Sequence, residues 1–210
     1  MLPGFTSVLA GQSAGRSLTY LDIVTVTDEN TDYTIPITFG AVSGDRVLVA
    51  VISAETLGGA TIDSVTIGGV SAPIRVQASA NLVTVGIASA IVTAGTSGNV
   101  EISFSDGGDT VSVALWSITG ADSATPRDTD SRTTAGALTL DCLDGGAVIA
   151  GNANGSLRTT TWTNATEQYD SGSSNYRYSG ASGETTGTSV TVTPTLSGSA
   201  IDLVYVAATF

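Results

Sequence analysis

Apolar and polar residues alternate with a period of two along most of the chain, which is typical of strands with one buried face. Val100, Ile102 and Phe104, for example, are expected to face one side of their strand, and the polar residues between them the other. No segment carries an apolar stripe with helical spacing. Strands are predicted over 22–28, 33–39, 46–54, 61–69, 82–92, 99–105, 110–119, 137–143, 147–153, 189–195 and 200–209.

Two of these segments are almost continuously apolar, from Val47 to Ile52 and from Leu203 to Ala208. Such runs suit central strands that are covered on both faces. The other segments alternate, as strands of a sandwich do when one face meets water. The sequence therefore predicts an all-β protein, an antiparallel β-sandwich with a jelly-roll-like arrangement.

A weak internal repeat suggests two similar halves. Residues 100–118 align with 190–208 without a gap, and both segments have the pattern of strand, glycine-rich turn and strand. Residues 48–50 similarly match 148–150. Because any two alternating hairpins align about this well, a true duplication and a chance likeness both stay open.

The segment 120–136 is polar, contains a proline and shows no alternation, so it is predicted to be a linker between halves 40–119 and 137–210. We expect one sandwich domain over 21–210, because each half alone would have a thin core. Two small lobes with a boundary near residue 128 are the alternative. The preceding residues 1–20 are expected to form an N-terminal arm.

Composition makes the chain acidic and favours order. Charged residues are only 12% of the total, and the mean hydropathy of +0.27 argues against intrinsic disorder. The formal net charge is -12, and the cationic residues are single and scattered. Because phosphate and anionic lipid are both repelled by such a field, neither nucleic acid nor membrane is an expected partner. The cationic residues are Arg16, Arg46, Arg75, Arg127, Arg132, Arg158 and Arg177.

The sequence contains no His and no Lys. Nucleophilic mechanisms that need either residue as a base, and a P-loop lysine, are therefore excluded. Paired carboxylates remain, as in glycoside hydrolysis. Because the candidate pairs lie in or beside turns, where Asp bonds local amides, we predict no enzyme and no cofactor. The pairs are Asp106 with Asp109, Asp128 with Asp130, and Asp141 with Asp144.

Calcium is a further candidate ligand, since the segments 28–32 and 128–130 gather carboxylate oxygens. Neither segment has the ligand spacing of an EF-hand, so solvated turn carboxylates are expected and no metal site is predicted. Cys142 is the only cysteine, which excludes an intrachain disulfide, and its apolar neighbours predict a buried thiol. Trp116 is likewise expected to pack in the core.

Aromatic side chains gather among polar residues in the segment 156–180, which we call the aromatic patch. Rings beside hydrogen-bonding groups suit a sugar, whose apolar face stacks on a ring while polar groups hold its hydroxyls. The same composition also suits an interface with another subunit. The candidate glycan ligands are Trp162, Tyr169, Tyr176, Tyr178, Arg158, Asn164, Asp170 and Arg177.

The N-terminal residues lack the basic and apolar regions of a secretory signal, and no stretch approaches the length of a membrane helix. We therefore expect synthesis in the cytoplasm. A terminal segment rich in small residues stays ordered only when something holds it. The arm 1–20 is thus expected to dock on a neighbouring subunit.

Several stretches together resemble a group of β-rich virion proteins of tailed phages and prophages. The resemblance covers most of residues 44–182, and it consists of turn and strand consensus without catalytic motifs. It implies a tail-fibre, tail-tip or capsid-surface location and transfers no functional residue. The stretches are GDRVLVAVISA, TIDSVTIGGVSA, ALWSITGADSATPRDT, GGAVIAGNANG, TTTWTNATEQYD and YSGAS.

The resulting hypothesis is a non-enzymatic structural protein of a tailed-phage virion. It would be displayed on the particle as a homo-oligomer for host attachment or capsid decoration, with other virion proteins and host-surface polysaccharide as partners. The first alternative is a carbohydrate-binding module that uses the aromatic patch. The second is a glycosidase that depends on paired carboxylates.

Overall fold

The computed structural model describes residues 16–56, 58–173 and 175–210. These residues form sixteen strands and no helix, and the strands pair in antiparallel sheets, which confirms the predicted all-β class. The jelly-roll likeness stays a prediction. Residues 1–15 of the predicted arm lie outside the described residues. Residues 17–20 belong to strand β1 (Ser17–Val26), so this part of the predicted arm is instead part of a sheet.

The first half of the chain, residues 16–119, forms one eight-stranded sheet around the long strand β8 (Ser97–Thr119). The beginning of β8 pairs with β2 (Asn30–Thr38) and β4 (Ile62–Ile67). The end of β8 pairs with β1 and β3 (Val47–Thr56). Because β8 changes partners along its length, the sheet curls and provides both walls of a sandwich.

The sequence predicted two strands within β8, separated by a turn at its glycines. The prediction of this turn is wrong, since the strand continues through Gly107 and Gly108. Gly108 leaves room for the bend: a Cβ there would lie 3.3 Å from both the Glu55 carbonyl oxygen and the Tyr33 hydroxyl. The remaining strands of this sheet are β5 (Val70–Ser71), β6 (Ile74–Ala80) and β7 (Val83–Ile91).

The second half, residues 120–210, forms two sheets. Its five-stranded sheet has the order β13-β14-β11-β16-β9, and its three-stranded sheet the order β10-β15-β12. The segment 120–136, predicted as a linker, contains the short strand β9. The strands are β9 (Asp128–Arg132), β10 (Leu138–Asp141), β11 (Ala147–Asn154), β12 (Thr160–Thr163), β13 (Thr166–Gly172), β14 (Arg177–Glu184), β15 (Ser189–Leu196) and β16 (Val204–Thr209).

The strand order of the second half repeats that of the first. The order β6-β7-β3-β8-β1 corresponds to β13-β14-β11-β16-β9, and β2-β8-β4 corresponds to β10-β15-β12. The register shows a similar correspondence. The pairing of β6 with β7 shifts by one residue before Val76, four residues from the last pair of that hairpin. The pairing of β13 with β14 shifts by one residue before Tyr169, three residues from the last pair. In this comparison β8 takes the place of both β15 and β16.

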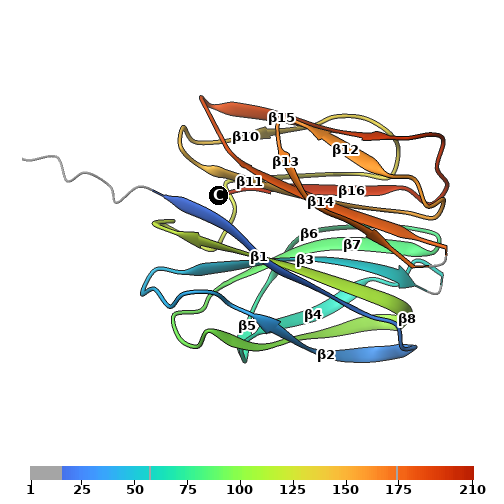
Figure 1. Cartoon of the computed structure of the whole chain (residues 1–210), viewed down its shortest axis with the longest axis horizontal. Coiled ribbons are helices and arrows are strands. Elements are labelled where there is room, and N and C mark those ends of the chain that lie inside the picture. Colours follow the sequence, from blue (N-terminus) through green and yellow to red (C-terminus); the bar gives the residue numbers. More distant parts are fainter. Residues whose placement is uncertain (1–15, 57, 174) are drawn as a thin grey trace, which may run out of the picture.

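The two halves stack face to face and enclose three apolar cores (Figure 1). One core fills the curled sheet of the first half and includes Ile35, Leu48 and Leu115. The second lies between the halves and includes Trp116 and Val206. The third separates the two sheets of the second half. Burial of apolar area in all three cores drives the folding of this block.

Several sequence predictions about the core are confirmed. The runs 47–52 and 203–208 are buried on both faces, because β3 and β16 each contact two of the three cores. Val100, Ile102 and Phe104 are buried, whereas Glu101 is exposed. Trp116 is completely buried and Cys142 is 1% exposed. The described part of the chain contains no helix that could span a membrane.

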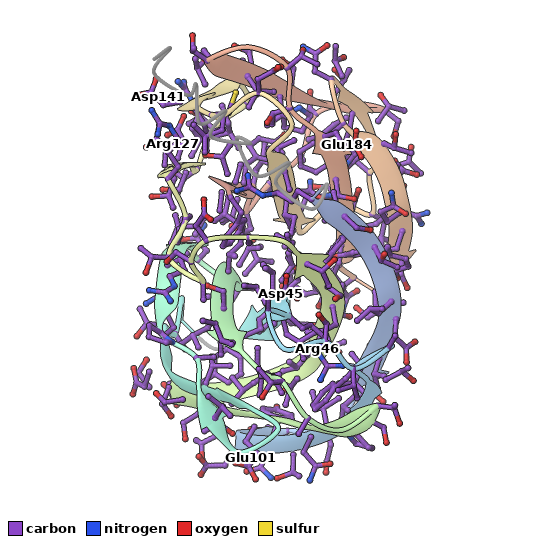
Figure 2. The ribbon with its side chains drawn as sticks, turned by 90° about the vertical axis from the view of Figure 1, so that its left-hand side faces the viewer. Asp45, Arg46, Glu101, Arg127, Asp141 and Glu184 are labelled. Carbon is purple, nitrogen blue, oxygen red and sulfur yellow. The ribbon has the colours of Figure 1, made fainter. Side chains whose placement is uncertain are left out.

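Arg46 is fully buried immediately before β3, in the lower part of the view in Figure 2. Its guanidinium donates to the carbonyl oxygens of two loops, and no carboxylate lies in salt-bridge contact with it among the described residues. Removal from water lowers the pKa of Arg46. Its side chain thus joins the loop after β2 to the loop after β7. The acceptors are the carbonyls of Val92, Phe39, Gly40, Ala41, Ala94 and Gly95, at 2.7–3.3 Å.

Candidate functional site

Three of the four rings in the predicted aromatic patch are buried between the halves. Tyr169, Tyr176 and Tyr178 are 8%, 6% and 0% exposed and belong to the core that the halves share. Their positions on β13, at the start of β14 and on β14 direct them toward the first half. The Tyr169 ring packs against Tyr20 and Trp116, with ring centroids 6.4 and 6.2 Å apart. These rings cannot stack on a ligand at the surface.

Gly180 explains the position of the Tyr169 ring. The two residues are paired across β13 and β14, and a Cβ at Gly180 would lie 2.3 Å from the ring carbon Cε1. The ring therefore lies flat over a residue without a side chain, as rings often do over glycines in sheets. Burial raises the pKa values of Tyr169, Tyr176 and Tyr178, as expected for hydroxyls that have lost water.

The fourth ring, Trp162, lies on the three-stranded sheet and is partly buried against the third core. Its indole Nε1 donates to Ser179 Oγ at 2.7 Å. Arg177 and Asp170 form an ion pair at 2.6 Å across β13 and β14. Each of these side chains is thus occupied by a partner in its own half.

Arg158 and Asn164 also bind backbone groups of the second half. Arg158 Nε donates to the Ser199 carbonyl at 3.0 Å, and Asn164 Nδ2 to the Thr191 carbonyl at 2.8 Å. The eight predicted ligands therefore do not meet on one surface. The prediction of a joint exposed site is wrong, because the first half covers the rings while the polar groups remain at other edges.

Four of the six candidate acids, Asp106, Asp128, Asp130 and Asp144, accept hydrogen bonds from backbone amides. Asp128 accepts from the amides of Thr129 and Asp141, both within 2.9 Å. Asp130 accepts from the Ser131 amide at 2.8 Å, and Asp144 from the Gly187 amide at 2.9 Å. No three His, Cys, Asp or Glu side chains within the described ranges are grouped so that they could hold a metal ion. Asp is favoured at such positions because it stabilises turns.

A groove of about 650 Å³ opens at the end of β15, and we call it the β15 groove. One wall is the connection between β9 and β10, at residues 133–135. The other wall is the end of β15, at residues 194–196, with the following loop. Tyr205 and Leu203 from the beginning of β16 complete it. Its lining combines aliphatic and hydroxyl groups with a single carboxylate, Asp202.

Sequence reasoning missed the β15 groove. A proline inside a predicted strand was one available signal, because Pro194 has no amide to donate and suits an open sheet edge. The halves also differ in strand length, since β2 has nine residues and β10 has four, but the predicted segments 33–39 and 137–143 are equally long and did not reveal it.

Tyr205 contributes a buried hydroxyl that has no hydrogen-bond partner within the described structure. Its side chain is 0% exposed, and burial raises the pKa of Tyr205 to about 12. An unpaired buried hydroxyl costs about 1–3 kcal/mol relative to a paired one. Because the hydroxyl has no solvent contact, it is a cost to the fold and not a binding group of the groove surface.

We expect Tyr205→Phe to raise the free energy of unfolding at pH 7 by up to about 1–3 kcal/mol, because it removes a buried hydroxyl that has no protein partner. In the original protein the folded pKa of about 12 exceeds the unfolded value of about 10. The folded state favours the neutral Tyr205 hydroxyl. The resulting contribution to the free energy of unfolding is fully present below pH 10 and is lost as the pH rises through about 12. Urea unfolding at several pH values should show the variant gaining stability relative to the original protein over this range. A constant difference would contradict the expectation.

Comparison of the chain with protein-family models, with curated proteins and with solved structures gives no match. The functional argument therefore depends on this chain's own residues.

Proposed function

We propose that this chain is a non-enzymatic structural protein on the surface of a tailed-phage virion, in a tail fibre, a tail tip or a capsid decoration. Its partners in this proposal are copies of itself, other virion proteins and host-surface polysaccharide. The observation that carries the proposal is the continuous apolar packing of two similar halves into one block. Such a block holds its surface loops at fixed separations, as a component of a particle must.

The chemistry of the chain supports the non-enzymatic part. The sequence provides neither His nor Lys for proton transfer at neutral pH. Four of its six candidate acids accept hydrogen bonds from backbone amides, as described above. The proposed location is supported by the resemblance of the segments from Gly44 to Ser182 to phage virion proteins.

Mass spectrometry of purified particles from a host that carries this gene tests the proposal. We expect the polypeptide in fixed stoichiometry with the major capsid protein. Hundreds of copies per particle indicate capsid decoration, and a few copies indicate a tail tip. Complete absence from intact particles, while the protein is present in the lysate, would contradict the proposal.

A further inference from the structure

Three aliphatic side chains project into solvent from neighbouring loops at one end of the molecule. Leu82, Leu157 and Ile201 are 40%, 45% and 66% exposed. They lie in the turn between β6 and β7, in the loop after β11 and in the loop before β16. In Figure 1 this end, where β16 begins, is opposite to the C-terminus. Apolar side chains grouped on adjoining loops mark a contact surface, whereas single exposed ones do not.

Hydrogen bonds join these loops and hold their exposed residues in place. The Gly155 amide donates to the Ile201 carbonyl oxygen at 2.9 Å, and the Ile201 amide donates to Ser156 Oγ at 2.9 Å. Asn81 Nδ2 donates to Asp202 Oδ1 at 2.5 Å, which connects a turn of the first half to a loop of the second. A surface that is already formed loses less entropy on binding. We call it the end surface, and it consists of Leu82, Leu157, Ile201 and Asp202.

Carboxylates lie beside the aliphatic side chains of the end surface. A Cβ at Gly155 would lie 3.2 Å from Asp202 Oδ2 and 3.3 Å from the Tyr176 ring carbon Cε1, so the carboxylate and the ring both border Gly155. Burial raises the pKa of Tyr176. Three nearby negative charges raise it further, those of Glu55, Asp202 and Asp109. None of these carboxylates forms an ion pair in the described part of the chain.

Aliphatic side chains beside unpaired carboxylates suit a Lys or Arg side chain. Such a side chain has a long aliphatic stem and a charged head, so the stem covers apolar groups while the head reaches a carboxylate. The β15 groove opens beside Asp202 and adds Ala200 and Leu203, which lengthen the surface for a stem. A free metal ion does not suit this place, because no three acids within the described ranges are grouped to ligate one.

The charge of the chain distinguishes between macromolecular partners. A second copy also carries a net charge of -12, so it would bring further carboxylates to this end. Nucleic acids and anionic lipids are repelled for the same reason. A basic protein segment is attracted instead, and its apolar side chains can cover the exposed aliphatic groups. The occupant that fits both features is a basic segment of a different protein.

We propose that the end surface binds a basic segment of another protein, with a Lys or Arg head at Asp202 and apolar side chains against the three aliphatic residues. Because Leu82 belongs to the first half and Ile201 to the second, the surface exists only while the two halves are packed together. This inference goes beyond the proposed function, since it names the chemistry of a partner and applies to the chain in any particle.

Selection of random peptides on the immobilised full chain provides the probe. We expect the selected peptides to combine Lys or Arg with apolar residues and to bind with micromolar dissociation constants in fluorescence anisotropy. Asp202→Asn should weaken this binding at least about fivefold, and so should Ile201→Ser. Asparagine keeps the oxygen that accepts from Asn81 and suits the left-handed backbone there, with φ 48°, so the fold is retained.

Glu101→Gln and Ile91→Ser are the matched controls, because they make the same chemical changes away from the end surface. Glu101 is exposed on the outer face of the first half (Figure 2). Ile91 is 51% exposed and is paired with Val47, at the opposite end of β3. Both controls should leave binding within about twofold. Because Asp202→Asn and Glu101→Gln change the net charge equally, a difference between them reflects position and not overall attraction.

Three results would overturn the inference. The first is that acidic or uncharged peptides are selected, or none at all. The second is that the two test variants weaken binding no more than their controls. The third is self-association of the full chain in sedimentation that Ile201→Ser abolishes, since the end surface would then bind a second copy. Detection of the chain in virions tests the proposed function separately.

Discussion

Replacing Arg46 with methionine is expected to lower the free energy of unfolding by about 3 kcal/mol or more. The substitution leaves six backbone carbonyls of two loops without their donor, and the hydrogen bonds to two of them, Val92 and Phe39, are buried. Arg46→Lys should cost nearly as much, because an ammonium cannot reproduce the planar arrangement of five donors. Urea unfolding followed by tryptophan fluorescence measures the loss.

Arg75→Met provides the control for Arg46. Arg75 is partly buried, and burial likewise lowers its pKa, but among the described residues it binds only the hydroxyl and the carbonyl of Ser89. We expect a markedly smaller loss of stability there. Equal losses at the two positions would mean that the removal of a buried charge decides the loss of stability, and not the loss of the hydrogen bonds from Arg46 to the two loops.

Trp116→Ala is expected to destabilise the protein by about 3–5 kcal/mol, as is usual for a large buried ring. Trp116 is fully buried in the core between the halves, and its ring centroid lies 5.2 Å from that of Tyr20. The cavity left behind would be bordered by both halves. Thermal unfolding monitored by circular dichroism provides the measurement.

Trp116→Phe separates packing from hydrogen bonding. The Trp116 indole Nε1 has no partner within the described structure, so phenylalanine removes an unsatisfied donor together with part of the ring. The loss should therefore be much smaller than for alanine. A phenylalanine variant as unstable as the alanine variant would indicate that Nε1 has a bound partner, such as an internal water.

The strands that could be predicted from sequence are those with a regular apolar pattern. β3, β7 and β16 expose almost nothing, and their aliphatic residues identify them directly. β9 escaped prediction because its residues, Asp128 to Arg132, are all polar at the edge of a sheet. β14 escaped for a different reason, since its buried positions other than Tyr178 carry Ser, Gly and Ala, which do not form a recognisable apolar pattern.

The aromatic patch failed as a site because the residues that bury it are distant in sequence. Tyr169 is covered by Tyr20 and Trp116, which come from strands of the first half. The polar residues next to these rings in sequence suggested that the rings are exposed. The sheet of the first half, which packs on them, buries them instead. The β15 groove could not be predicted from local pattern either, because its two walls come from segments that are distant in sequence.

Because β1 pairs with β8 and β9 pairs with β16, folding of the chain during its synthesis can proceed in two stages. Ser17 pairs with Thr119, and Asp128 pairs with Thr209, so each half closes on its own last strand. A ribosome that has released residue 119 has already supplied every strand of the first half. This half then waits with one apolar face uncovered until the remaining residues emerge. Sheets closed by such distant pairings fold slowly, so the interval before the second half arrives is when the nascent chain is most exposed to aggregation.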